Sequence, residues 1–259
     1  MKKKLRDGCQ MLVVAAALVL PGIGSADDNN AGMDHSNRED RDHENKSGRD
    51  NDDDKDLSFR KLSAQWWQWI LSIPTIDSPL LDQSGEKCMV GQRGPIWFLA
   101  GLPDPRSAAV SRTCSVPQGT TLFFPVANYA QVNTPGDCGQ NEPLAVAEMR
   151  SNLAPLIDSI NIRTVTVDGV AVGGITRVRS VPFVTALPKD NLFVAPCTNQ
   201  SPAGQRPGIF SPSVGDGYYV KIDGLKAGKH LLQFTAKSNA GTFDHTVTYD
   251  LTVVPVSLR

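Results

Sequence analysis

The sequence predicts a mostly β fold of the α+β class, an antiparallel β-sandwich-like domain with two helices and two disulfides. Short runs rich in Val, Thr, Phe and Tyr recur from residue 94 onward, each bounded by Gly, Pro, Asn or Asp. Segments near 58–73 and 142–160 instead place apolar residues at steps of three and four, which is typical of amphipathic helices. The chain after residue 26 contains an even number of cysteines, which favours disulfides.

The N-terminal segment predicts a cleaved secretory signal peptide over residues 1–26. Four Lys and Arg residues among the first six precede an apolar run over 11–20, and small residues follow up to Ala26. A membrane-spanning helix needs about 20 apolar residues, about twice the length of this run. We therefore expect an exported mature chain, secreted or periplasmic, without a membrane span.

Residues 27–56 are predicted to be a disordered acidic linker. They hold twelve acidic and five basic residues, no aromatic residue, and Met33 as the one large apolar side chain. Such a segment buries too little apolar surface to offset its loss of conformational entropy. Residues 57–259 then suit a single β-rich domain. Their weak net charge and scattered Lys and Arg residues argue against a nucleic-acid partner.

The first predicted helix contains the stretch SAQWWQWILSI, residues 63–73, and Pro74 follows its end. Trp66 and Trp69 lie on its apolar stripe, so we expect them to pack into the core. Trp67 lies off this stripe and is a candidate for contact with a ligand. The alternative is partial burial of Trp67 at the edge of the helix.

The second predicted helix carries Met149 and Leu153 on one stripe, and Pro143 suits its first turn. Pro155 lacks a backbone donor, so it should kink or divide the helix. The segment 195–216 has no periodicity and many turn residues, so it is predicted to be a long loop.

The β-type runs include one strong hairpin. Asp168 and Gly169 stand between alternating residues, which predicts a two-residue turn. Glycines separate the last three runs, which we expect to form an antiparallel meander. These runs cover residues 218–222, 230–237 and 245–254.

The cysteines of the mature chain are Cys88, Cys114, Cys138 and Cys197. Of the three pairings possible, we favour Cys88 with Cys114 and Cys138 with Cys197, because the first two flank a strand-rich segment that could fold back on itself. The spacings match no zinc site, since there is no CxxC and no nearby His. We predict no metal and no cofactor.

Two histidines, His230 and His245, are candidate site residues. Each stands at the start of a predicted strand, and neighbouring strands would bring the imidazoles together. With Asp216, Asp223 or Asp244 they could ligate a metal or form an acid–base pair. The alternative is that each satisfies backbone groups at a strand edge.

Aromatic residues suggest a second candidate site. Tyr218 and Tyr219 point to opposite faces of their strand, so one of them could be exposed. Together with Trp67 or Trp97 it could form a surface on which sugar rings stack, because flat apolar rings suit carbohydrate without needing charge. Core packing of these residues is the alternative.

Several motifs resemble those of a group of exported bacterial proteins. They are WWQW followed by Pro, then CMVGQRGPIWFLAG, then RTCSVPQGTTLFFPVAN, and the closing GLKAGKHLLQFTAKS and FDHTVTYDLTV. The resemblance covers most of residues 60–254. It implies no activity, cofactor or site residue, because none is established for the group.

These observations favour a non-catalytic binding module for carbohydrate or another component of the cell envelope or exterior. The sequence lacks the GxSxG motif of serine hydrolases, and the folded part has few histidines. A secreted hydrolase and a structural or matrix module are the alternatives. Geometry separates the three. An exposed row of aromatic residues favours the binding module, His230 or His245 in a deep cleft with a carboxylate favours the hydrolase, and a large apolar patch favours the structural module.

Overall fold

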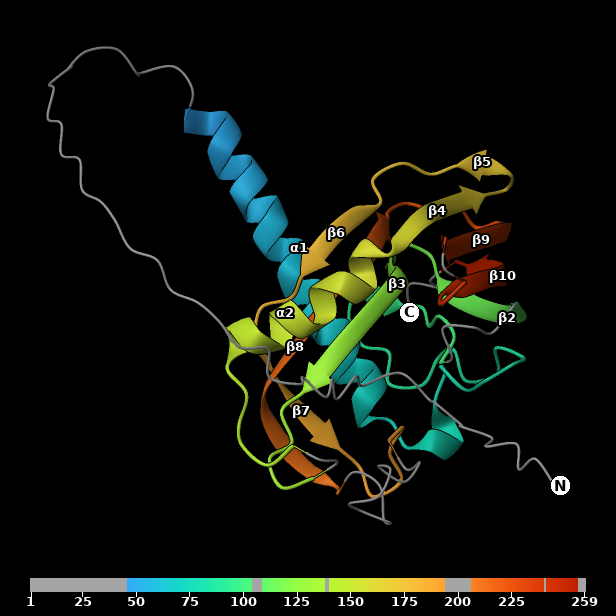
Figure 1. The fold of residues 1–259 in the computed structure, drawn as a ribbon. Coiled ribbons are helices and arrows are strands. Elements are labelled where there is room, and N and C mark those ends of the chain that lie inside the picture. Colours follow the sequence, from blue (N-terminus) through green and yellow to red (C-terminus); the bar gives the residue numbers. More distant parts are fainter. Residues whose placement is uncertain (1–45, 104–108, 138–139, 194–205, 240, 256–259) are drawn as a thin grey trace, which may run out of the picture.

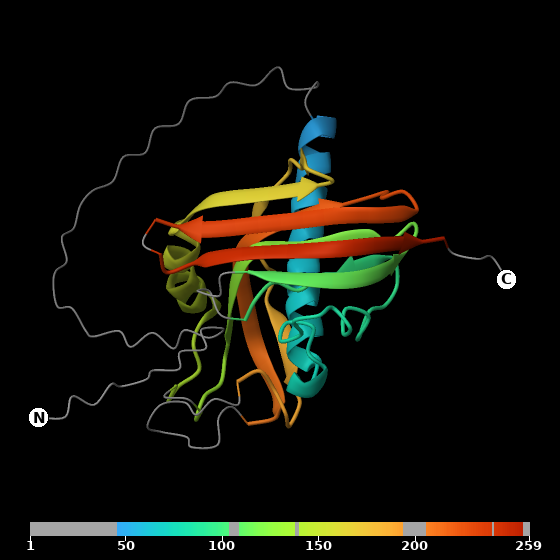
Figure 2. The same cartoon turned by 90° about the vertical axis from the view of Figure 1, so that its right-hand side faces the viewer.

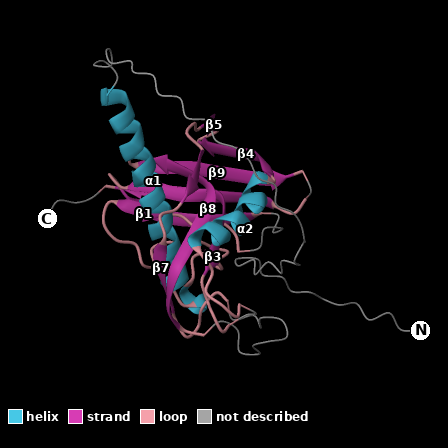
Figure 3. Cartoon of the chain, turned by 60° about the vertical axis from the view of Figure 1, so that its left-hand side comes forward, coloured by secondary structure: helices cyan, strands magenta, loops and turns pink. Residues whose placement is uncertain are grey.

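The computed structural model describes residues 46–103, 109–137, 140–193, 206–239 and 241–255. These residues form two β-sheets that pack against each other, so the predicted mostly β class is confirmed (Figure 1, Figure 3). Helix α1 (Lys46–Ser72) lies against the outside of one sheet, and α2 (Val146–Asp158) closes one end of the space between the sheets (Figure 2). A 3-10 turn, η1 (Thr75–Asp77), follows α1.

We call the two sheets A and B. Sheet A has the strand order β1 (Ile96–Phe98), β3 (Thr121–Val132), β8 (Gly208–Ile222) and β6 (Thr176–Arg179), and β7 (Phe183–Leu187) also pairs with β8. Sheet B has the order β2 (Val110–Pro117), β10 (Asp244–Val254), β9 (Gly228–Ser238), β4 (Ile160–Val167) and β5 (Val170–Ala171).

Most strand pairs are antiparallel, as predicted, but each sheet also contains one parallel pair. β1 pairs with β3 in parallel, and β2 pairs with β10 in parallel; the remaining pairs are antiparallel. Parallel neighbours need a long connection, and β2 and β10 are the first and last strands of sheet B along the chain. Local patterns do not reveal such distant pairing.

The predicted C-terminal meander is correct only in its second half. β9 and β10 form an antiparallel hairpin, but β8 belongs to the other sheet. The chain crosses from sheet A to sheet B between β8 and β9, through Gly224 and Gly228, which both have positive φ. β8 also begins at Gly208, so residues 208–216 of the predicted loop are a strand, held by pairing with β3 and β7.

The short β4–β5 hairpin is confirmed. Asp168 and Gly169 have φ values of 52° and 78°, the left-handed conformation that the two-residue turn requires. Helix α2 is also where the sequence placed it, but Pro155 lies inside a continuous helix and does not divide it. Pro155 is exposed, whereas Met149, Leu153 and Ile157 face the core.

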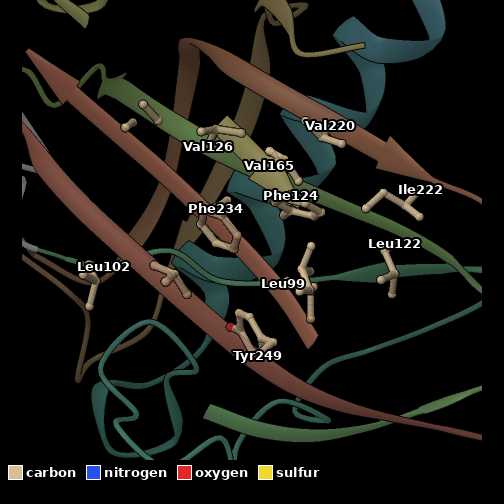
Figure 4. Close-up of a cluster of buried hydrophobic side chains, with 14 of the residues drawn as sticks. Leu99, Leu102, Leu122, Phe124, Val126, Val165, Val220, Ile222, Phe234 and Tyr249 are labelled. Carbon is tan, nitrogen blue, oxygen red and sulfur yellow. The ribbon is translucent and has the colours of Figure 1, made fainter. Parts of the chain in front are cut away.

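The main core lies between the sheets (Figure 4). Phe124 of β3 and Phe234 of β9 meet across it with ring centroids 4.9 Å apart. The core is built from alternating inward-facing side chains, as the period of two predicts. Its labelled members in Figure 4 are Leu99, Leu102, Leu122, Phe124, Val126, Val165, Val220, Ile222, Phe234 and Tyr249.

A second core lies between sheet A and α1. This helix begins at Lys46, twelve residues before the predicted start, so it includes residues 46–56 of the predicted linker. Extending an anchored helix adds one hydrogen bond per residue, which is easier than starting one. The signal peptide and the linker up to residue 45 lie outside the described residues. In the described part, neither helix is long and apolar enough to cross a membrane.

The segment between α1 and β2 is fastened by a disulfide and by a buried arginine. Cys88 and Cys114 are joined, as predicted, with their Cα atoms 5.9 Å apart. The other predicted pair, Cys138 and Cys197, lies outside the described residues. Arg112 of β2 is 1% exposed, and within the described residues its hydrogen bonds go to uncharged oxygens. Its acceptors are the carbonyls of Leu80, Asp82, Ala100 and Gly101 and the hydroxyl of Tyr249.

Candidate functional site

The aromatic candidates do not form an exposed stacking surface in the structure. Trp67, Trp97 and Tyr219 are 2%, 5% and 0% exposed. Tyr218 is half-buried, and the guanidinium of Arg163 covers its ring at 4.1 Å. These four residues therefore contribute to the two cores, which is the alternative that the sequence left open.

Trp67 is buried because α1 is enclosed on more than one side. The indole NH groups of Trp66 and Trp69 each donate to a carbonyl of the segment before β2, those of Leu99 and Val90, at 2.9 Å. Trp67 packs instead on Gly215 of β8, in sheet A. Its Nε1 has no regular hydrogen bond, although the indole lies beside the hydroxyl of Tyr219.

The two histidines lie near opposite ends of the β9–β10 hairpin. His230 pairs with Leu251, whereas His245 pairs with Ala236. Six residue steps along β9, from His230 to Ala236, separate the two positions by about 20 Å, so the imidazoles cannot share a metal or a proton. His245 is buried and packs on Phe243, with ring centroids 4.2 Å apart.

His230 fastens the turn between β4 and β5. Its Nδ1 lies 2.8 Å from a carboxylate oxygen of Asp168, and its Nε2 lies 2.9 Å from the carbonyl oxygen of Lys226. Both neighbours are acceptors, so the doubly protonated imidazolium satisfies both. The hydrogen bond to Asp168, followed by the one to Lys226, raises the pKa of His230, and partial burial opposes the shift. The same bond lowers the pKa of Asp168.

We predict a titration that follows from this pair. The stabilisation of the turn by protonated His230 is complete below about pH 6.5 and is lost as the pH rises through the raised pKa of His230. NMR titration of the His230 ring should give a pKa above 6.5, and Asp168→Asn should move it back toward 6.5. Asn tolerates the positive φ at position 168, so the turn survives. An unchanged pKa in this variant would show that Asp168 does not hold the imidazolium.

Asp216, the carboxylate nearest to the predicted tyrosine site, belongs to a buried ion pair. It is 1% exposed, and the Nε and Nη2 atoms of Arg177 donate to its two oxygens at 3.1 and 2.9 Å. Arg177 also reaches Asp158 at the end of α2, so the pair connects α2, β6 and β8. The bonds to Asp216 raise the pKa of Arg177. Asp216 therefore acts in the fold and is not available as an acid–base group.

The outer face of sheet B is a regular surface that no described helix or strand covers (Figure 2). We call it the hydroxyl face, because about half of its outward-facing side chains end in a hydroxyl group. They belong to β2, β10, β9 and β4, and each is exposed or half-buried. They are Ser111, Thr113, Ser115, Thr246, Thr248, Thr252, Thr235, Thr164 and Thr166.

Strand register aligns these hydroxyl groups in rows across the sheet. Thr164, Thr235 and Thr246 are directly paired neighbours, and the hydroxyls of Thr235 and Thr246 are 3.1 Å apart. In the next row the Gln233 amide donates to the Thr248 hydroxyl at 3.2 Å. Directly opposite residues of neighbouring strands share a face, so each row is continuous.

Charge on this face is confined largely to its ends. Lys237 of β9 pairs with Asp244 of β10, with Nζ and Oδ1 3.1 Å apart, at one end of the hairpin. Lys229 is at the other end, opposite Thr252. Asp250 is the single charged side chain among the central positions. Apart from Asp250 and the apolar Leu231 opposite it, the middle of the face is therefore uncharged and hydrogen-bonding.

This face was not predicted from the sequence, where the candidate site residues were aromatic residues and histidines. The pattern was present in HTVTYDLTV and RTVTV, where Thr alternates with apolar residues. Alternation predicts that the Thr side chains share one face of each strand. It does not reveal that β2 and β4 flank the β9–β10 hairpin, so the breadth of the face follows only from the strand order.

A second, smaller feature is a groove between α1, β7 and the start of β8. Its volume is about 390 Å³, with an apolar floor that includes Phe183 and Pro212 and a rim that includes Lys61, Gln65 and Gln68. The Gln68 amide donates to the carbonyl of Val184 at 3.0 Å across this groove.

Comparison with known proteins identifies no family for the chain. No protein-family model matches it, and no curated protein sequence matches it. The resemblance of its motifs to exported bacterial proteins stays a prediction. Within the described residues, His, Cys, Asp and Glu form no group of three that could hold a metal ion.

Proposed function

We propose that this protein is an exported, non-catalytic carbohydrate-binding protein, and that the hydroxyl face of sheet B is its binding surface. The observation that carries the proposal is the uncovered array of Ser and Thr side chains on four neighbouring strands, which has Asp250 as its one central charge. The basic and apolar N-terminal segment supports export, and the Cys88–Cys114 disulfide fits an oxidising compartment.

The chemistry of the face favours a neutral, hydroxylated partner. Ser and Thr hydroxyls donate and accept hydrogen bonds, as sugar hydroxyls do, and the Thr methyl groups add small apolar contacts. An acidic polymer would need a basic surface, but Lys229 and Lys237 lie at the ends and Asp250 lies near the centre. The candidate acid–base groups are held in structural contacts, His230 by Asp168 and Asp216 by Arg177, which supports binding over catalysis.

The test is adsorption of the purified mature protein to insoluble neutral polysaccharides, namely cellulose, chitin and β-1,3-glucan. We expect adsorption to at least one of them. Thr248→Lys places a long charged side chain in the centre of the hydroxyl face, so it should weaken adsorption at least tenfold while the fold persists. Thermal melting and circular dichroism check the fold.

Thr176→Lys is the matched control, because Thr176 is exposed on β6 of sheet A and receives the same substitution. It should adsorb like the unmodified protein. Equal losses in both variants, or adsorption that survives Thr248→Lys, would place the binding surface elsewhere. Failure to adsorb to all three polymers would contradict the proposed function itself.

A further inference from the structure

We infer that the hydroxyl face recognises the ordered surface of an insoluble neutral polysaccharide, where several chains lie side by side, and not a single soluble chain. This inference rests on the proposed function and deepens it by naming the physical form of the ligand. It follows from the breadth of the face, from the kind of side chains on it, and from the position of its charges.

The face is broad in both directions. Its hydroxyl groups lie on four adjacent strands, which at about 4.8 Å between strands span about 14 Å. Along each strand, same-face residues recur about every 6.7 Å, and β10 carries Thr246, Thr248 and Thr252 in this phase. Figure 2 shows the strands side by side as an open layer, with no described helix or strand in front of them. A single sugar chain would contact only one row or one strand.

The side chains on the face also favour many weak contacts over a few strong ones. None of its named residues is aromatic, so it offers no ring on which an individual sugar can stack. Hydrogen bonds between exposed hydroxyls replace bonds with water and contribute little each. Affinity must then come from many contacts made together, and a ligand with fixed, repeated hydroxyl groups supplies them without ordering a flexible chain.

Three of the hydroxyl groups at the centre of the face are held by neighbouring side chains. Thr235 and Thr246 bond to each other, and Gln233 bonds to Thr248, so these side chains are fixed across the β9–β10 pair before any ligand arrives. The ion pair of Lys237 with Asp244 keeps its charges at the end of the hairpin. An array that is partly fixed in advance and carries little charge complements a rigid, uncharged ligand surface.

The experiment compares the two physical forms of the same sugar. Adsorption to microcrystalline cellulose and to crystalline chitin is measured alone, then with the soluble hexasaccharide of each polymer at the same total sugar concentration. We expect the soluble hexasaccharide to displace less than a tenth of the bound protein. Thr235→Val and Thr248→Val remove a hydroxyl and keep the shape, so each should weaken adsorption about two- to threefold, and together about five- to tenfold.

Displacement by the hexasaccharide at equal sugar concentration would overturn the inference and leave carbohydrate binding standing. Loss of nearly all adsorption in one Thr→Val variant, with the other unaffected, would also overturn it, because that result indicates one strong subsite. Absence of adsorption to cellulose, chitin and β-1,3-glucan alike would instead remove the proposed function on which the inference rests.

Discussion

Arg112→Met should lower the free energy of unfolding by about 3–5 kcal/mol. The side chain is buried in sheet B, and methionine can fill much of its volume. It cannot donate, however, so the carbonyls of the segment before β2 lose their partner away from water. Arg112 also donates to the hydroxyl of Tyr249, so the variant removes one hydrogen bond from this buried group. Burial raises the pKa of Tyr249, and the charge of Arg112 opposes that effect.

Chemical denaturation of the disulfide-intact protein measures this loss, and Arg93→Met is the matched control. Arg93 is exposed, so its replacement should change the stability by less than about 0.5 kcal/mol. A loss below about 1 kcal/mol in Arg112→Met would mean that water or a local rearrangement satisfies the carbonyls, and that Arg112 does not organise this segment.

Trp67→Ala should cost about 3–5 kcal/mol, as much as truncation of either neighbouring tryptophan. The indole is 2% exposed and fills the space above Gly215, so its loss creates a cavity between α1 and sheet A. The same contact is tested from the other side by Gly215→Ala. A Cβ atom there would lie 2.5 Å from Trp67 Nε1, so we expect a loss of about 1–3 kcal/mol.

A double-mutant cycle isolates this contact. Trp67→Phe makes room beside position 215, so Gly215→Ala should cost less in that background than in the unmodified protein. Gly173→Ala is the control, since a Cβ atom there meets no other atom within 4 Å. Thermal or chemical unfolding supplies each value. If the two substitutions are additive, Trp67 does not rest on Gly215.

The tryptophans show how far helical periodicity could predict the structure. It placed Trp66 and Trp69 correctly in the core, because a step of three residues keeps both on one side of α1. It placed Trp67 at an edge, because a single stripe assumes a single buried side. The segment from Leu80 to Leu99 covers α1 on a further side, and only its long-range contacts, such as the bond from Trp66 to Leu99, reveal this.

The strands show the same division between local and distant information. Local patterns predicted most strands, the Asp168–Gly169 turn and the Cys88–Cys114 pair. They could not predict that β8 belongs to sheet A while β9 and β10 belong to sheet B. The turn residues between β8 and β9 are compatible with pairing of these two strands and with a crossing between the sheets. The separation of His230 from His245 is likewise a matter of register along β9 and β10.

The candidate site was the least predictable part. The alternating threonines are visible in the sequence, but Thr is common in any exposed strand because it suits a pleated surface. Their arrangement as one face depends on four strands meeting in the order β2, β10, β9 and β4, and β2 joins that order by parallel pairing. No local pattern contains this information.

The central claim, that the hydroxyl face is the binding surface, is tested most directly by hydroxyl-radical footprinting on the polysaccharide-bound protein. Exposed aliphatic side chains report on each surface: Leu231 and Ile162 stand on the hydroxyl face, with 45% and 46% exposure. Ile209 of β8 and Val184 of β7, with 77% and 46% exposure, report on the region of the groove beside α1. We predict that binding protects Leu231 and Ile162 and leaves Ile209 and Val184 unchanged; protection of Ile209 and Val184, with Leu231 and Ile162 still oxidised, would contradict the account.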